Sequence, residues 1–446
     1  MKKILFVILI TLTLTLTLVA CNGDNENGGS SVEKSTSTTT VSTTTTGPWI
    51  ASEGLEFSLN IDCASYSVIG LGDCIDPNVV IPKTHEGLPV TDIGPYAFSG
   101  CIYIETVAIP DTIKTIEYRA FEDCYSLKSI VVPDSVTYIA DGVFLNCLNL
   151  ESATLGASIT VMGESTFKNC KRLTNVTIGS SVMSIGERAF EGCIALESIN
   201  LPTSLTSIGA YAFYNCSVLN DVTIPNSVTN IGSHAFFNCA ALERVNIPDA
   251  VSNIGSCAFN KCTSLKSFEV GANNGSYKAI DGNLYSKDAK TLIQYALGKS
   301  DSSFVIPNTI TNIERYAFYG CTNLQNVTVP NSATEIGYYA FYGCTSLKSV
   351  NIPNSVNYIL ENAFAGCSSL ESVTIPSSVT GIDRYAFYNC TSLTNVVFEN
   401  TEGWKYKNNI LDDNGSEIYS TDLADSTSAA QFLTRVYASY YWACNQ

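Results

Sequence analysis

Phenylalanine recurs at a strict 23-residue step along most of this 446-residue sequence. The step starts at Phe98, is interrupted once between Phe259 and Phe318, and ends at Phe387, and a cysteine follows each of these phenylalanines three residues later. Self-similarity at a period of about 20–50 residues is the signature of a solenoid, in which each repeat stacks on the next. The phenylalanines are Phe98, Phe121, Phe144, Phe167, Phe190, Phe213, Phe236, Phe259, Phe318, Phe341, Phe364 and Phe387.

The spacing inside one repeat predicts two short extended segments and a turn. In repeat 219–241, Val222 and Ile224 alternate with polar residues, so both face the core from a strand that Pro225 ends. Residues 228–231 form a second short extended segment, and a glycine then allows a tight corner. The Ala-Phe-x-x-Cys stretch that follows has the near-helical spacing of one short helical turn.

The consensus LxxVxIPxxVxxIGxxAFxxC resembles the BspA-like leucine-rich repeats of bacterial surface proteins, over about residues 79–398. The resemblance implies a β-rich leucine-rich-repeat solenoid with a parallel concave sheet and short helical turns on the convex side. It also implies a role in adhesion, since members of the family are associated with binding to host matrix and to other bacteria. Fold alone does not establish such a function.

Three segments depart from the period and predict a hairpin and two caps. Residues 272–303 carry turns at Asp281 and Asp288 between apolar runs, which predicts a β-hairpin inserted into one coil. Residues 49–78 are expected to cap the first strand, because an exposed edge invites aggregation. Residues 399–446 have apolar residues at helical spacing and predict a helical cap, with Ser426 or Ser428 as its N-cap.

The N-terminus predicts export. Residues 1–20 have two lysines before an apolar run that is too short for a membrane span, which indicates a signal peptide. The run ends in Leu-Val-Ala-Cys, which resembles a lipobox, so Cys21 is the expected lipidation site; the alternative is an ordinary signal peptide followed by an unrelated cysteine. Residues 21–48 are rich in Ser, Thr and Gly and form the expected flexible stalk. We therefore expect a lipid-anchored protein at the outer face of a bacterial membrane.

Charge and composition argue against several classes of function. A net charge of −17 repels nucleic acid and anionic lipid, so we expect no nucleic-acid partner and membrane contact only through the lipid. The chain has two histidines and no nucleophile elbow, metal-spaced cluster or phosphate loop, so we expect no enzyme activity, metal or cofactor. His85 is assigned to a loop and His234 to the convex surface, and Asp281-Gly282-Asn283 is assigned to a turn because it lacks the alternating acids of a calcium loop.

The cysteines divide into one repeated column and a few others. The twelve that follow the phenylalanines match no zinc motif, and parallel Cβ vectors on stacked coils disfavour disulfides, so we expect buried, reduced thiols. Cys63 and Cys74 lie in the N-terminal cap, where an exported fold can use a disulfide, and their pairing stays open. The sequence indicates no partner for Cys257 or Cys444.

Two surfaces are candidates for binding. The outward positions of the strands are small, neutral and without aromatic anchors, and the charges beside them, such as Glu105, Lys128 and Glu151, read as cross-repeat pairs that set register. The aromatic residues that flank the repeat phenylalanines form a stripe that either binds a partner or only covers the core. We name this set the aromatic stripe: Tyr211, Tyr214, Phe237, Tyr316, Tyr319, Tyr339, Tyr342, Tyr385 and Tyr388.

These features favour a monomeric, surface-anchored binding protein that recognises a protein or glycan on a host or neighbouring cell. The alternative is a structural coat or spacer protein without a specific ligand. The small, neutral side chains on the strand face favour this alternative. An enzyme or enzyme accessory is a third class, for which no residue pattern speaks.

Overall fold

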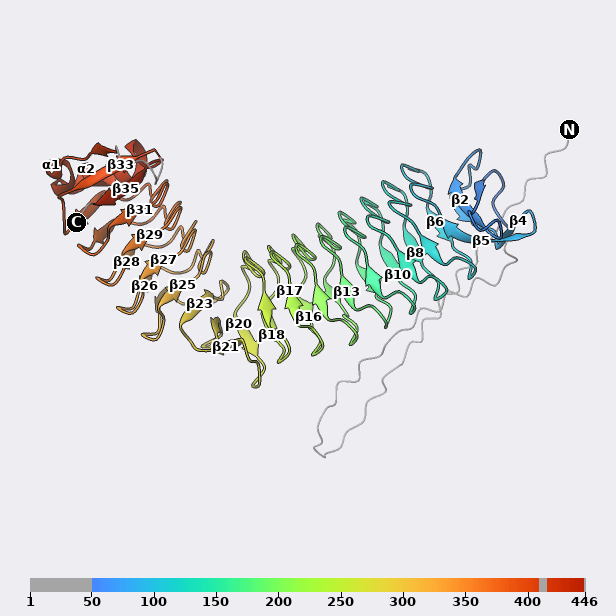
Figure 1. The fold of residues 1–446 in the computed structure, drawn as a ribbon, viewed down its shortest axis with the longest axis horizontal. Helices are drawn as coiled ribbons and strands as arrows, with labels where there is room; N and C mark the ends of the chain where they lie inside the picture. The colour runs from blue at the N-terminus through green and yellow to red at the C-terminus, as the bar shows by residue number, and fades with distance from the viewer. Residues whose placement is uncertain (1–49, 409–414, 445–446) are drawn as a thin grey trace, which may run out of the picture. The chain divides into compact units, whose positions relative to one another are not determined.

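A computed structural model of the chain describes residues 50–408 and 415–444. The predicted signal peptide, the lipidation site Cys21 and the stalk lie outside the described residues. The remainder is one repeat body, and we use "rung" for each 23-residue coil and "column" for one position along successive rungs. The rungs follow one another in chain order (Figure 1).

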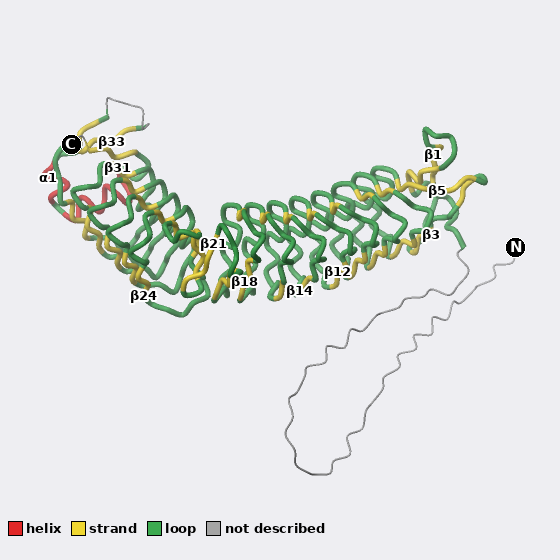
Figure 2. The backbone as a smooth tube through the Cα atoms, turned by 60° about the horizontal axis from the view of Figure 1, so that its bottom comes forward, coloured by secondary structure: helices red, strands yellow, loops and turns green. Residues whose placement is uncertain are grey.

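Each rung contributes one strand to each of two parallel rows (Figure 2). Paired strands within the regular repeats are parallel with a register of one whole repeat, as Ser152 with Asn175 in the first row and Ser207 with Asn230 in the second. The pairs β3–β6 at the start and β23–β25 after the insertion are also parallel but have other registers. The first row is β3 (Asn78–Val80), β6 (Thr106–Ala108), β8 (Ser129–Val131), β10 (Ser152–Thr154), β12 (Asn175–Thr177), β14 (Ser198–Ile199), β16 (Asp221–Val222), β18 (Arg244–Ile247), β20 (Ser267–Val270), β24 (Ser303–Val305), β26 (Asn326–Thr328), β28 (Ser349–Asn351), β30 (Ser372–Ile375) and β32 (Asn395–Phe398).

The second row comes from the Val-x-x-Ile segment of each repeat and is equally regular. The sequence predicted both extended segments, and the paired strands confirm them. The row is β5 (Leu88–Ile93), β7 (Thr115–Ile116), β9 (Tyr138–Ile139), β11 (Val161–Met162), β13 (Ser184–Ile185), β15 (Ser207–Ile208), β17 (Asn230–Ile231), β19 (Asn253–Ile254), β23 (Thr291–Gln294), β25 (Asn312–Ile313), β27 (Glu335–Ile336), β29 (Tyr358–Ile359) and β31 (Gly381–Ile382).

The corner around each repeat phenylalanine is not the helical turn that the sequence predicted. Its alternate backbone N–H groups donate to the next rung, as Tyr211 to Ser233 at 2.9 Å and Phe213 to Ala235 at 2.7 Å. Left-handed φ angles at Tyr211 (56°) and Asn215 (61°) turn these N–H groups along the stacking direction. A helix needs right-handed residues throughout, so the corner is a run of turns that forms a third ladder between rungs.

The core consists of columns that run through the stacked rungs. Phe236 is fully buried between Phe213 and Phe259, with ring centroids 5.1 and 5.3 Å apart. Every repeat phenylalanine is buried in the same way, so the columns form continuous apolar stacks. Two buried clusters result, one up to Ala296 and one starting at Tyr285, and they divide at the insertion.

The insertion forms a hairpin, as its turns predicted. Strands β21 (Tyr277–Ile280) and β22 (Asn283–Ser286) pair antiparallel around Asp281 and Gly282, whose φ angles of 48° and 73° are those of a tight hairpin turn. Strand β23 follows antiparallel to β22 and then pairs in parallel with β25. The hairpin thus lies between the two regular stacks.

Both ends of the body carry caps. At the start, β1 (Glu56–Leu59) pairs antiparallel with β2 (Tyr66–Gly70), which joins β5, while β4 (Thr84–His85) forms a small hairpin with β5. At the end, β35 (Tyr441–Cys444) pairs antiparallel with β31 and with β33 (Trp404–Lys407), and β34 (Ser416–Glu417) continues that sheet.

The C-terminal cap is helical, but its helices are short: α1 (Ser420–Ala424), α2 (Ser426–Gln431) and the π-helical segment η1 (Phe432–Val436). The N-cap of α2 is Asp425, whose carboxylate accepts from the backbone N–H of Ser428 at 2.7 Å, so the predicted serine cap was wrong. A carboxylate does the same work as a serine hydroxyl at this position. Within residues 50–408 and 415–444, no helix has the length and apolar character needed to cross a membrane.

Candidate functional site

The aromatic stripe forms two neighbouring columns of stacked rings on the corners of the rungs. In one column Tyr211 stacks on His234 with centroids 4.7 Å apart, and in the other Tyr214 stacks on Phe237 at 5.0 Å. The second stack of rungs repeats this arrangement, with 5.1 Å for both Tyr316–Tyr339 and Tyr319–Tyr342. The structure therefore brings Tyr211, Tyr214 and Phe237 together in one block, and Tyr316, Tyr319, Tyr339 and Tyr342 in another.

The rings of the stripe are only partly exposed to solvent. Most are half-buried, and the most exposed are Tyr342 (36%) and Tyr388 (44%). Tyr385 and Tyr388 contact each other edge to face at 5.6 Å. Ordered rings that are partly buried lose little conformational freedom when they meet a partner.

Three cations that the sequence analysis did not single out lie over these rings. The guanidinium of Arg188 lies 4.9 Å from the Tyr211 centroid, and that of Arg315 lies 5.4 Å from the Tyr316 centroid. Lys261 Nζ lies 5.6 Å from the Phe237 ring and 5.7 Å from Tyr319, so it bridges the two blocks across the insertion. Their signal was available, because each lies within three residues of a repeat phenylalanine.

The two histidines lie in aromatic packing. His234 belongs to the ring column and is half-buried, with Nδ1 lacking a partner among the described residues, so its assignment to the convex surface was incomplete. Burial lowers the pKa of His234, because the charged imidazolium would lose solvation. His85 stacks on Phe57 at 4.0 Å in the N-terminal cap.

The repeated cysteines are part of the core and form hydrogen bonds between rungs. Ten column thiols donate to the carbonyl oxygen of the phenylalanine in the preceding rung, as Cys124 Sγ to Phe98 O at 3.1 Å. The same carbonyl accepts the N–H of Cys101, so both of its lone pairs are used. Burial raises the pKa of the Cys262 thiol to about 12. The expected buried, reduced thiols are found from Cys124 to Cys390, and Cys101 in the first rung is partly exposed.

The cysteines outside the column are also free. The disulfide that we left open between Cys63 and Cys74 is not formed: Cys63 is exposed and Cys74 is buried. The two residues lie beyond opposite ends of β2, and a five-residue strand separates its ends by about 16 Å, whereas disulfides need Cα atoms within about 7 Å. Cys257 and Cys444 are buried free thiols.

The family of the chain follows from the repeat itself. Residues 77–197, 183–287 and 290–407 match the BspA type leucine rich repeat region. The chain belongs to this family. Leucine-rich repeat proteins are typically non-catalytic.

Several solved structures resemble this chain. A leucine rich cell surface protein from Faecalibacterium prausnitzii is 32% identical, with a TM-score of 0.62 over 79% of this chain and 95% of that one. The pneumococcal vaccine antigen PcpA is 25% identical (TM-score 0.56; 79% and 82% covered), and a leucine-rich repeat protein from Bacteroides ovatus is 26% identical (TM-score 0.55; 78% and 88% covered). No curated protein matches the sequence.

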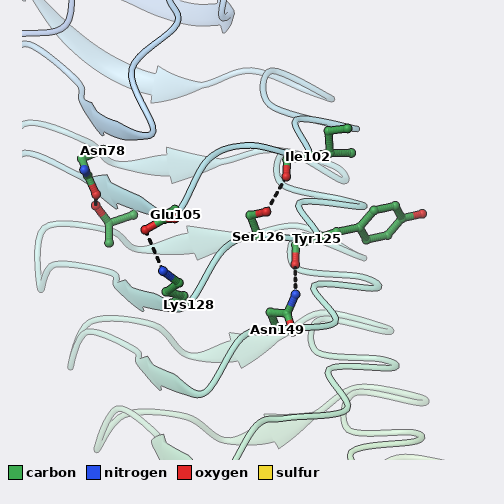
Figure 3. Close-up of polar contacts among 8 residues, drawn as sticks. Asn78, Ile102, Glu105, Tyr125, Ser126, Lys128 and Asn149 are labelled. Atoms are coloured by element: carbon green, nitrogen blue, oxygen red, sulfur yellow. Dashed lines mark hydrogen bonds and ion pairs between the residues drawn. The ribbon is translucent and has the colours of Figure 1, made fainter.

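The polar face of the BspA-type rungs is occupied by contacts between rungs. Lys128 pairs with Glu105 at 2.7 Å, Ser126 donates to the carbonyl of Ile102, and Asn149 donates to that of Tyr125 (Figure 3). The cross-rung pairing that the sequence predicted is therefore present, and exposed ion pairs of this kind contribute at most about 1 kcal/mol. Among the described residues, no group of three or more His, Cys, Asp or Glu side chains is placed to hold a metal ion.

The ladder of the corners opens at the insertion, between the two stacks of rungs. In the part of the chain that the structure describes, the N–H groups of Cys257, Phe259 and Lys261 have no backbone acceptor, although the equivalent groups of the rungs from Phe98 to Phe236 and from Phe318 to Phe364 donate to the next rung. At the end of the solenoid, the N–H groups of Phe387 and Asn389 also have no backbone acceptor. The cause at the insertion is the shortened coil at β23, which has three residues from Leu292 to Tyr295 where a regular coil has five. A cavity of about 330 Å³ lies at this opening, and burial there raises the pKa of Cys257 to about 11.

Proposed function

We propose that this chain is a surface-displayed binding protein that recognises a macromolecule of a host or neighbouring cell through the aromatic stripe. The observation that carries the proposal is the pair of stacked ring columns flanked by Arg188, Lys261 and Arg315. The similarity to a leucine rich cell surface protein, 32% identical to this chain, supports display outside the cell. Among the described residues, the outward positions of the first-row strands carry no aromatic ring.

The physical basis of this proposal is preorganisation. Tyrosine and arginine dominate binding energies at protein surfaces because they combine a large apolar area with hydrogen-bonding groups. In the stripe the rings already stack at 4.7–5.1 Å, so binding does not have to order them. Arg188 already pairs with Glu187 and Glu191 at 3.4 Å, whereas Lys261 and Arg315 have no ion pair among the described residues and would be available to acidic or polar groups of the partner.

The proposal predicts that removing two adjacent rings abolishes capture. Full-length protein is immobilised and exposed to surface extracts of host cells and of neighbouring bacteria, and the captured material is quantified. Tyr214→Ser combined with Phe237→Ser is expected to reduce capture at least about tenfold, because each aromatic anchor contributes about 2 kcal/mol or more. The matched control, Asn246→Ala with Asn351→Ala on the strand face, is expected to bind like the wild type.

Two results would redirect this proposal. Capture lost only in the strand-face variant would place the binding surface there. Absence of specific capture by any form would favour the spacer function.

We also propose that Cys21 is lipidated and anchors the protein at the outer face of a bacterial membrane. The motif Leu18-Val19-Ala20-Cys21 supports this assignment. Cys21→Ser is expected to move the protein from the membrane fraction to the detergent-free soluble fraction, whereas the control Cys63→Ser stays with the membrane. A Cys21→Ser protein that is still cleaved before residue 21 and still sediments with membranes would contradict the lipobox.

A further inference from the structure

The opening in the corner ladder lies in line with the aromatic stripe, between its two blocks. In the rung of Phe259 the two stripe positions hold Cys257 and Asn260 in place of rings. The Asn260 side-chain amide donates to the backbone carbonyl of Tyr316 at 3.2 Å, so the two stacks of rungs meet at this point. The cavity of about 330 Å³ at the opening is lined by residues of both stacks and of the hairpin, and we call it the junction cavity.

Two buried backbone donors line the junction cavity. Cys257 and Phe259 are only 9% and 2% exposed. The N–H group of each lacks a hydrogen-bond acceptor among the described residues, and both residues are part of the cavity wall. A buried N–H group without a partner is rare in folded proteins, because it has lost its hydrogen bond to water and gained none in return. These two groups are therefore donors that a ligand can use.

Both donors point toward the junction cavity. Cys257 and Lys261 have a φ of 58°, close to the 56° of Tyr211, which holds the same repeat position as Cys257. The corner therefore keeps the regular conformation, in which alternate N–H groups point along the stacking direction toward the next coil. For this rung the next coil is the shortened one, and its residues Ile293 and Gln294 line the same cavity.

The arrangement of the donors selects the shape of the ligand. In the preceding rungs, donors two residues apart reach two different carbonyls that are also two residues apart, which are Ser233 and Ala235 for the rung of Phe213. The donors are therefore parallel, whereas the N–H groups of an anion-binding loop converge on one point. Alternate carbonyls of an extended peptide face the same side, as they do in a β-ladder. The two donors thus match an extended peptide backbone better than a single carboxylate or phosphate.

The other walls of the junction cavity favour an uncharged ligand with small side chains. Glu314 and Arg315 both line the cavity, so their opposite charges balance. An anion would gain no net attraction from this lining and would meet a chain with net charge −17. Ile254, Leu284 and Ile293 contribute apolar surface. The volume is at the lower end of the range of about 300–1,000 Å³ for ligand pockets, so only a short segment fits.

We propose that the junction cavity binds a short, extended, uncharged peptide segment of a partner protein, whose alternate carbonyls accept from the N–H groups of Cys257 and Phe259. This inference deepens the proposed function and rests on it, because it names a protein as the macromolecule that the stripe recognises. The bound segment completes the corner ladder across the opening. Main-chain hydrogen bonds then supply affinity, and the cavity walls restrict the side chains, as in other cases where a peptide adds to a protein's backbone ladder.

The first test uses peptides that the protein itself selects. A phage-displayed library of random heptapeptides is selected on immobilised full-length protein, and the enriched sequences are synthesised with acetylated and amidated ends. We expect uncharged sequences rich in small residues. Their binding is expected to slow amide hydrogen exchange at Cys257 and Phe259 at least about tenfold, because a bonded N–H group exchanges only after its hydrogen bond opens.

A blocking variant and its matched control separate the junction cavity from the rest of the surface. Ser256→Tyr places a ring in the wall of the cavity. Tyr338 holds the same repeat position in another rung, so the variant is expected to fold with an unchanged Tm. It is expected to bind the selected peptides at least about tenfold more weakly than the wild type, because the ring takes the space of the peptide. Ser233→Tyr, the same change one rung earlier, where the corner ladder is closed, is expected to bind like the wild type.

Several results would overturn the proposal. These are a selection that enriches no peptide, peptides that leave exchange at Cys257 and Phe259 unchanged, and equal peptide binding by Ser256→Tyr. Protection of the same two amides by sodium acetate would also overturn it, because the cavity would then be a carboxylate site. The stripe function fails separately: capture from cell extracts that is lost in the Tyr214→Ser, Phe237→Ser protein and retained in Ser256→Tyr upholds the stripe while rejecting the peptide site.

Discussion

Raising the pH from 8 to 10 is expected to unfold the repeat body cooperatively. Burial raises the pKa of nine column thiols, from Cys147 to Cys367, above the ordinary value of 9.0, and that of Cys262 reaches about 12. Below pH 9 these thiols are protonated in both the folded and the unfolded chain, so their ionisation does not lower the free energy of unfolding. Above pH 9 only the unfolded chain loses these protons, and stability falls by about 1.4 kcal/mol per thiol per pH unit, or about 12 kcal/mol for nine.

Urea unfolding at pH 8.0, 9.0, 9.5 and 10.0 measures this slope. Cys193→Ala combined with Cys216→Ala is expected to lower the slope by two thiols, about 2.7 kcal/mol per pH unit, which separates thiol ionisation from that of tyrosine. Buried tyrosines such as Tyr285 add a loss of the same sign, but only above pH 10. An unfolding free energy that stays flat up to pH 10.5 would show that the column thiols are open to solvent in the folded protein.

Phe236→Ala is expected to destabilise the body by about 3–5 kcal/mol, because it leaves a ring-sized cavity in a continuous stack. The ring is fully buried between Phe213 and Phe259, and the backbone ladders on both sides prevent the neighbouring rungs from closing the gap. Urea denaturation at pH 7.5 measures the change.

The adjacent residue provides the control for this variant. Phe237→Ala removes a ring of the same size from the half-buried stripe, where water replaces it, so we expect a loss of about 1 kcal/mol. Equal losses for Phe236→Ala and Phe237→Ala would contradict the assignment of Phe236 to the core and of Phe237 to the surface.

Much of the candidate site could be predicted from the sequence, because residues at the same position of successive repeats lie side by side in the solenoid. Once the 23-residue step is known, Tyr211 and His234, or Tyr214 and Phe237, must be neighbours at one strand spacing, and the structure shows them stacked. The break at Asn362 and Ala365 is also visible as a departure from the consensus. How the neighbouring tyrosine rings are oriented at this break depends on their side-chain torsions, which the spacing does not specify.

Cys63 and Cys74 show a second kind of limit. Eleven residues of separation are compatible with a bridge when the intervening chain turns back and incompatible when it is extended. Pairing of β2 with both β1 and β5 keeps that segment extended. Pairing with strands distant in the sequence, and not the local sequence, therefore keeps these two thiols apart.

The sequence by itself determined the solenoid, its register and its buried columns, because a side chain repeated every 23 residues can be buried only if successive coils stack in register. The tertiary structure alone decided the corners and the junction. The pattern Ala-Phe-x-x-Cys fits both a helical turn and a run of turns. The two differ in whether the backbone N–H groups donate to carbonyls of their own coil or of the next coil, and the pattern does not specify this. The N–H groups of Tyr211 and Phe213 donate to carbonyls of the next coil, because the stacked coil places those carbonyls within reach. For Cys257 and Phe259, the shortened coil at β23 does not provide these acceptors.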